Sequence, residues 1–165
     1  MSGQLSYTYQ TPKGVAGSLF DISPYSIDSR VNGEASDDAM KFGMGVVQGA
    51  APGTDVKVPA AADTADKFEG VALTGFTQQM NTAGEVKIYN MQTVGILRWG
   101  RAWVRVAGSA DPAYGDSLYL IKSGSERGMF TNESDSGANI AINGKFIGSP
   151  GTGGTAPAVI YNQKN

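Results

Sequence analysis

The residues best suited to chemistry lie together in one short stretch, ILRWGRAWVRV, which runs from Ile96 to Val106. It contains both tryptophans of the chain and three arginines. An arginine beside an aromatic ring can stack on nucleic acid, hold a substrate in an active site, or anchor a partner protein. The rest of the sequence must decide between these three.

The composition argues against most enzymes and against nucleic acid. With no histidine there can be no Ser-His-Asp triad, and with no cysteine there can be no zinc-thiolate site or cysteine nucleophile. The formal net charge of -2 lacks the basic excess of nucleic-acid-binding proteins. No apolar run approaches the roughly 20 residues that span a bilayer, and the N-terminus does not resemble a signal peptide. We therefore expect synthesis in a cytosol-like compartment, with neither nucleic acid nor membrane as a direct partner.

Two loops and a set of aspartates are weaker candidates for sites. The loop GSPGTGGT, residues 148–155, lacks the lysine of a phosphate-binding P-loop, and NESDSGAN, residues 132–139, lacks the spacing of an EF-hand. A pair of carboxylates could hydrolyse a glycoside without histidine. The aspartates that could form one lie mostly in turns: Asp37, Asp38, Asp63, Asp66, Asp111 and Asp116. We predict a protein that is not an enzyme, with no catalytic, cofactor-binding or metal-binding residues.

As a strand, the stretch has two different faces. Ala102, Val104 and Val106 alternate onto one face, which is small and apolar and is expected to face the core. The opposite face is bulky, aromatic and cationic, and it is formed by Arg101, Trp103 and Arg105. Gly100 is expected to bend or bulge the strand, which leaves the facing of Arg98 and Trp99 open.

The bulky face has two interpretations. Trp103 can lie under the chain's own N-terminal segment, with the arginines paired to nearby carboxylates. Alternatively the face grips a neighbouring protein, because Trp, Tyr and Arg are enriched at interface hot spots. We predict that this face contacts a neighbouring protein, and that aromatic residues of the N-terminal segment take part in the same contact. The predicted interface residues are Tyr7, Tyr9, Phe20, Tyr25, Arg98, Trp99, Arg101, Trp103 and Arg105.

The remaining pattern predicts a mainly β protein. The 23 glycines and 7 prolines favour short strands joined by turns, so we expect a single antiparallel β-barrel or β-sandwich body over residues 41–165. Residues 1–40 show no sustained period and are expected to form an extended, largely irregular N-terminal arm. Pro52-Gly53 predicts a turn, Asn143-Gly144 a hairpin turn, and Pro59 an edge position for the short strand before it. Residues 84–106 are expected to supply two or three strands.

The order of several short motifs resembles a known family. PKGVAGSLFDI, FGMGVVQG, FEGVAL, GRAWVRVAG followed by DPAYGDSLYL, and GKFIGS followed by APAVIY are similar to the cement, or decoration, proteins of tailed-bacteriophage capsids. The resemblance implies a β fold without catalytic residues or cofactor. It also implies synthesis in the host cytoplasm and a place on the capsid exterior of the virion. There the protein is expected to bind the major capsid protein and sister copies, as a homodimer or homotrimer. The alternative is a carbohydrate- or surface-binding β-sandwich module of a virion, with Trp99 or Trp103 as the stacking platform.

Overall fold

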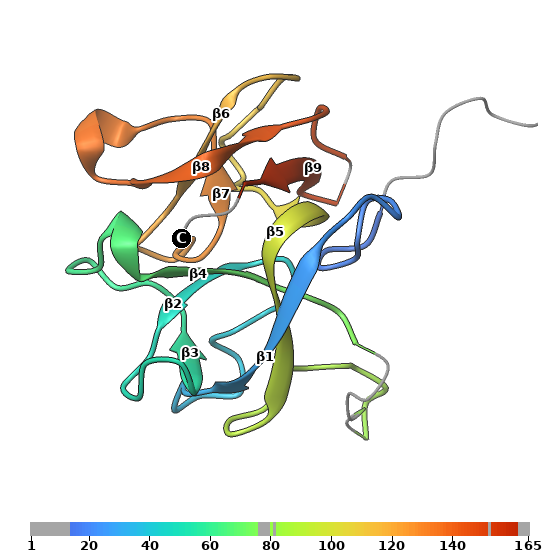
Figure 1. The fold of residues 1–165 in the computed structure, drawn as a ribbon, viewed down its shortest axis with the longest axis vertical. Coiled ribbons are helices and arrows are strands. Elements are labelled where there is room, and N and C mark those ends of the chain that lie inside the picture. Colours follow the sequence, from blue (N-terminus) through green and yellow to red (C-terminus); the bar gives the residue numbers. More distant parts are fainter. Residues whose placement is uncertain (1–13, 76–79, 81, 152, 162–165) are drawn as a thin grey trace, which may run out of the picture.

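The computed structural model describes residues 14–75, 80, 82–151 and 153–161 (Figure 1). Its strands are β1 (Ser26–Asn32), β2 (Gly45–Gln48), β3 (Asp55–Lys57), β4 (Phe68–Ala72), β5 (Thr93–Arg105), β6 (Ser117–Leu120), β7 (Phe130–Thr131), β8 (Ile140–Phe146) and β9 (Thr155–Ile160). Two short 3-10 helices are present, η1 (Ala65–Lys67) and η2 (Asp135–Gly137). None of the described helices is long and apolar enough to cross a membrane. The prediction of a mainly β protein is confirmed.

Two rings of strands share the long strand β5, which runs through both halves of the molecule in Figure 1. In the first ring the order is β1-β3-β2-β4-β5, and pairing of β1 with β5 closes it into a five-stranded barrel. In the second half the order is β5-β9-β8-β6-β7, and an isolated bridge between Val106 and Phe130 returns to the end of β5. The pairings between named strands are antiparallel except that of β1 with β3. Closure of the first ring leaves it without a free edge along which another chain could pair.

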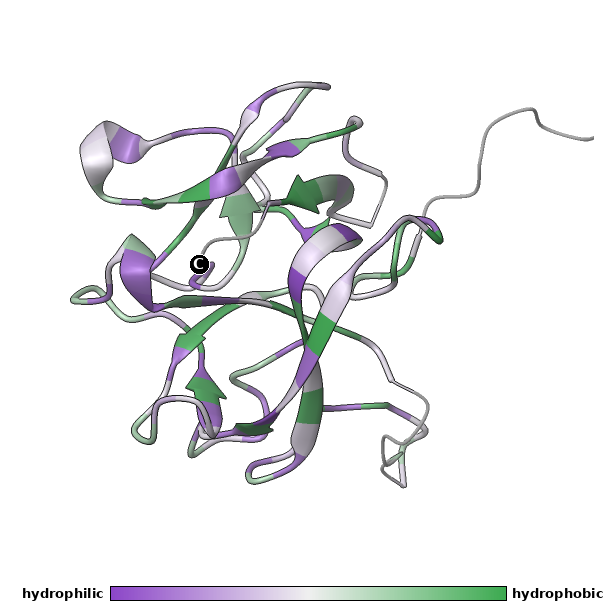
Figure 2. Cartoon of the chain, in the orientation of Figure 1, coloured by the Kyte–Doolittle hydropathy of each residue, from purple (hydrophilic) through white to green (hydrophobic). Residues whose placement is uncertain are grey.

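The buried hydrophobic residues form two clusters, and the second also takes in Phe68 and Val71 of β4 from the first ring. Met40, Val46, Val56, Ile88 and Ile96 are among the buried residues of the first. The second core contains the predicted apolar face of β5, whose exposed fractions are 1% for Ala102, 0% for Val104 and 4% for Val106. Figure 2 shows hydrophobic residues concentrated along the strands, whereas the connecting loops are mostly pale or hydrophilic. The alternation read from the sequence is therefore confirmed for this face.

Gly100 allows β5 to serve both halves. Before it, β5 pairs with β1 and β4, and from it onward β5 pairs with β9. Gly100 has φ of 131°, and a Cβ at this position would lie 2.7 Å from the Cβ of Tyr25. A bulge lies just before this glycine, where the register of β5 against β1 passes from Trp99 directly to Leu97. The expectation of two or three strands is wrong. One strand of 13 residues runs from Thr93 to Arg105, preceded by an isolated bridge between Met80 and Val86.

The predicted hairpin turn at Asn143-Gly144 is also wrong, because both residues lie inside β8. Against β6 the register passes from Lys145 directly to Ile142, so the dipeptide forms a bulge. On the other side of β8, Gly144 pairs with Ile160, and a Cβ on Gly144 would lie 2.5 Å from the carbonyl oxygen of Val159. The glycine therefore permits close approach of β9, a role that the same dipeptide can fill as well as a turn.

Two further expectations are corrected near the N-terminal end. Ser26–Asn32, expected to be irregular, forms β1 and pairs with β5 along its length. Its side chains are mostly polar or partly exposed, so it lacks the apolar alternation by which a strand is recognised. β3 is not an edge strand, because it lies between β1 and β2. The Pro52-Gly53 turn is confirmed: the N–H of Thr54 donates to the carbonyl of Ala51, and Gly53 has φ of 84°.

Candidate protein interface

The chain's own residues 14–21, here called the strap, cover the tryptophan on the bulky face of β5. The N–H of Gly17 donates to the carbonyl of Trp103 at 2.8 Å, and the N–H of Trp103 donates to the carbonyl of Ser18 at 2.9 Å. The N–H of Phe20 donates to the carbonyl of Arg101 at 3.0 Å. These bonds make the strap a short additional strand beside the second half of β5, where Leu19 bridges to Ala102.

Trp103 is packed against the strap from two directions and is only 8% exposed. Its indole lies 5.7 Å from the ring of Phe20, centroid to centroid, at 47°. It also lies so close to Gly14 that a Cβ there would be 2.1 Å from the ring. Gly14 is thus required by the indole rather than by a turn. Any contact between this face and a second protein must therefore be made by the residues on either side of Trp103.

The three arginines around Trp103 all have partners within the chain. Arg101 pairs with Asp21 of the strap at 2.8 Å. Hydrogen bonds from Ser23 and Arg101 hold the pKa of the Asp21 carboxyl below its usual value. Arg98 pairs with the buried Glu69, and its Nε lies 3.7 Å from Asp28. Nε of Arg105 donates to the carbonyl of Phe42 at 2.8 Å.

An exposed aromatic and apolar surface lies at the end of the strap, where the chain passes into β1. It contains Ile22, which is 100% exposed, and Phe20, Tyr25 and Tyr161, which are 37%, 47% and 46% exposed. A pocket of about 390 Å³ opens in the same region. Its lining residues are Ser23, Pro24, Trp99, Gly100, Arg101, Val159, Ile160 and Tyr161. We call the four exposed residues and this pocket the aromatic surface.

The aromatic surface unites part of the predicted interface. Phe20, Tyr25, Trp99 and Arg101 meet here, although the first two are about 75 positions from the others in the sequence. Arg98 and Arg105 lie elsewhere, and Tyr7 and Tyr9 fall outside the described residues. Ile22 and Tyr161 were not predicted. The apolar run before Tyr161 indicated only a closing strand, and nothing in the sequence signalled that its end would lie beside Trp99.

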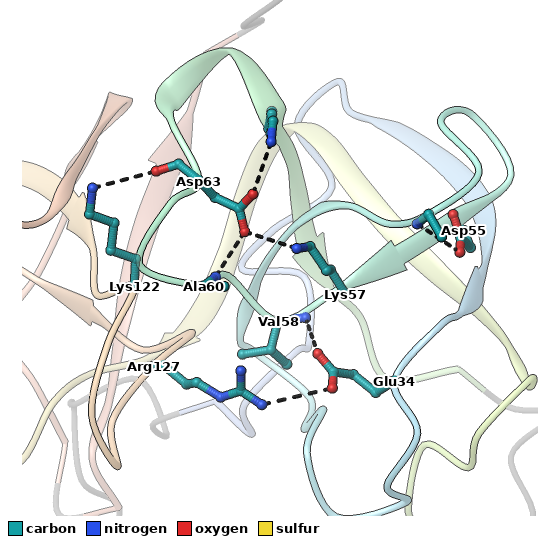
Figure 3. A network of polar contacts seen from close by, with 10 residues as sticks. Glu34, Asp55, Lys57, Val58, Ala60, Asp63, Lys122 and Arg127 are labelled. Carbon is teal, nitrogen blue, oxygen red and sulfur yellow. Dashed lines mark hydrogen bonds and ion pairs between the residues drawn. The ribbon is translucent and has the colours of Figure 1, made fainter.

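A polar network joins the two halves of the molecule on another side (Figure 3). Asp63, only 2% exposed, accepts a hydrogen bond from the N–H of Ala60 and pairs with Lys57 and Lys67, each at 3.2 Å. Burial raises the pKa of the Asp63 carboxyl, but the Ala60 N–H and the two ammonium groups outweigh burial and leave this pKa below its usual value. Lys122, from the loop after β6, donates to the carbonyl of Asp63 at 3.5 Å. Asp63 therefore holds a loop in place.

The other predicted carboxylates also serve loops. Oδ2 of Asp116 accepts a hydrogen bond from the N–H of Ala113 at 2.9 Å and a second one from Nδ2 of Asn132. These hydrogen bonds hold the pKa of the Asp116 carboxyl below its usual value. Asp37 accepts the N–H of Asn90. Among the described residues, no three or more carboxylates gather as metal ligands would. Asp63 and Asp116 each accept the N–H three residues earlier, as their turn context indicated, whereas Asp37 joins two segments that are distant in sequence.

Taken together, the fold and the surface define a β-barrel protein with an aromatic patch of the composition found at protein–protein contacts. The chain belongs to the structural cement protein family (E217 gp24/Pam3 gp6), whose family model matches residues 4–161. It is thus a structural protein of a phage capsid and of the virion. A chain in the solved capsid of Myoviridae phage XM1 has the same fold, with a TM-score of 0.70 and 20% identity, covering 99% of this chain and 100% of that chain. No curated protein matches the sequence.

Proposed function

We propose that the protein binds the outer surface of a phage head and bridges neighbouring copies of the major capsid protein through its aromatic surface. The observation that carries the proposal is the exposure of large apolar side chains at one pocket in a member of the structural cement protein family. Tyr161 lines this pocket, and the exposed Phe20, Ile22 and Tyr25 belong to the segment that contributes Ser23 and Pro24 to it. Aromatic and large apolar side chains supply most of the binding energy of protein interfaces when they become buried. Many equivalent sites on a shell multiply a modest contact into stabilisation of the whole head.

Co-sedimentation with expanded heads that lack the protein tests this proposal. Wild-type protein is expected to bind saturably and to raise the temperature at which the heads release DNA. Ile22→Asp is expected to weaken binding at least about tenfold, because it places a charge in the buried contact without touching the fold. Met91→Asp is the matched control, since Met91 is 72% exposed and lies outside the aromatic surface.

Two results would count against the proposal. Failure of the wild-type protein to sediment with heads refutes capsid binding. Equal binding by Ile22→Asp and Met91→Asp refutes the assignment of the surface. Deleting residues 1–13, which include Tyr7 and Tyr9, tests the arm in the same assay. This deletion spares the strap and β1, and it is expected to leave the body folded while weakening head binding.

Sister copies are the second proposed partner, in a homodimer or homotrimer. Sedimentation equilibrium of the protein without heads measures this association. Because a fully exposed isoleucine in a self-contact becomes buried twice in a two-fold dimer, Ile22→Asp is expected to shift the equilibrium toward monomer.

Carbohydrate binding is a second candidate function, favoured by the presence of Trp99 and Tyr161 in one pocket. Aromatic rings in a shallow pocket can stack on the apolar face of a sugar. Retention on a glycan array that is lost in Trp99→Ala, together with no binding to heads, would support this function over the first.

A further inference from the structure

Arg105 differs from every other arginine that the structure describes. Those others each pair with a carboxylate: Arg30, Arg98, Arg101 and Arg127. No carboxylate of the described residues lies within ion-pair distance of Arg105, although this residue is only partly exposed. A partly buried guanidinium without a counter-ion is costly unless something else supplies the negative charge.

The guanidinium of Arg105 is held in position by the neighbouring segment. Its main-chain N–H donates to the carbonyl of Gly43 at 2.8 Å, and its Nε donates to the carbonyl of Phe42 at 2.8 Å. The two terminal amino groups have no acceptor among the described residues, and both are reached by solvent. Because Nε is already fixed, binding through the amino groups costs less side-chain entropy than it would for a free arginine.

Arg105 lines a pocket of about 310 Å³. Its apolar wall includes Met40, Phe42 and Ile88, and its rim carries Lys41 and Lys87. The carboxylates that share the lining already have partners. Nζ of Lys87 lies 2.8 Å from Oδ1 of Asp38 and 3.7 Å from Oε2 of Glu85. Asp37 accepts a hydrogen bond from the N–H of Asn90. The cations not paired in this way are therefore Arg105 and the exposed Lys41 on the rim.

We propose that this pocket binds a carboxylate, supplied by an acidic side chain of the capsid protein on which the molecule docks. The identity of the partner rests on the proposed function, whereas the chemistry of the pocket does not. Two parallel N–H groups of a guanidinium match the two oxygens of a carboxylate, and Lys41 adds a second positive charge. The aliphatic part of a glutamate or aspartate side chain lies against Phe42 and Met40.

The chemistry is tested on the isolated protein by titrating glutarate and following the Nε–Hε signal of Arg105 by NMR. A saturable shift is expected, and none of comparable size with sodium chloride at equal ionic strength. Arg105→Lys keeps the positive charge but lacks the two parallel N–H groups, so it is expected to bind glutarate more weakly. Shifts of the amide signals of Phe42 and Gly43 measure this binding. A shift that does not saturate, or that chloride reproduces, overturns the carboxylate site.

The partner is tested by the binding of Arg105→Gln to heads. Binding is expected to weaken at least about tenfold, and this loss is expected to shrink in high salt. Lys145→Gln is the matched control, because Lys145 is exposed on β8 and lines neither pocket. Unchanged binding by Arg105→Gln, with glutarate binding intact in the wild type, overturns the assignment to the capsid. If the wild-type protein does not bind heads at all, the proposed function fails, and the titration still decides the site.

Discussion

Replacing Trp103 with alanine should release the strap while leaving the two cores intact. The indole is 8% exposed and contacts Gly14 and Phe20, so the variant loses an aromatic pair and much of the apolar area buried by the strap. Truncation of a buried tryptophan costs about 3–5 kcal/mol in a core, and an aromatic pair contributes about 1 kcal/mol. Part of the indole's burial is against β5 and its neighbours, so we expect about 2–4 kcal/mol to be lost from docking of the strap.

Hydrogen exchange measures this loss where it occurs. The N–H groups of Gly17 and Phe20 are bonded to β5 only while the strap is docked. A loss of about 2–4 kcal/mol predicts that both exchange about 30 to 1,000 times faster in Trp103→Ala. The N–H of Phe146, which is bonded to the carbonyl of Asp116 in the second half, is expected to exchange at its wild-type rate.

Trp99→Ala is the matched control, since Trp99 is half-buried in the neighbouring pocket rather than under the strap. Two outcomes would contradict the reasoning. If Gly17 and Phe20 exchange equally fast in both variants, the indole does not hold the strap. If Phe146 accelerates as much as they do, the strap is part of the cooperative core and cannot open alone.

The remaining predictions concern stability. Asp63→Asn should destabilise the protein by about 2 kcal/mol at pH 7, measured by urea unfolding, because it leaves two lysines facing a neutral group. Since the folded-state pKa of Asp63 lies below the usual value near 3.8, its contribution is fully present above pH 3.8 and is lost as pH falls further, so the variant should approach the wild type in acid. Gly70→Ala should lower stability by about 3 kcal/mol or more, because its Cβ would meet the carbonyl oxygen of Leu97 at 2.1 Å with φ at 148°. Gly53→Ala, where φ is 84° and nothing lies within 4 Å, should cost only about 1 kcal/mol.

The parts of the fold that the sequence predicted are those set by local alternation. The apolar face of β5 was identified because a strand places every second residue on one side. The pattern could not show that β5 continues through Gly100 and joins two rings, because that depends on β1, β4 and β9, which are distant in sequence. The prediction of a hairpin turn at Asn143-Gly144 was wrong for the same reason, because the strands on either side of β8 determine whether the dipeptide forms a bulge or a turn.

The candidate site shows a similar division. Four of the predicted interface residues, Phe20, Tyr25, Trp99 and Arg101, meet at the aromatic surface. The sequence left two covers open for Trp103, the chain's own N-terminal segment and a neighbouring protein, and the structure shows the first. Period 2 could not choose between them, because it predicts the side to which a residue points and not what lies there. For Asp63, the sequence indicated one ion-pair partner, Lys67, which follows four residues later. The second partner, Lys57 from the preceding strand, is seen only in the structure.

The geometry of β5 connects the two proposed contacts. Arg101 and Arg105 point to the same side of the strand and are four residues apart, about 13 Å. Trp103 lies between them and is covered by the strap. The bulky face therefore meets its own chain in the middle, and its two ends reach the aromatic surface and the Arg105 pocket. Because β5 contributes to both cores, neither end can move relative to the other without disrupting a ring. A rigid spacing of this kind suits a protein that must fit a fixed arrangement of subunits, since no conformational entropy is lost in setting the distance between its contacts.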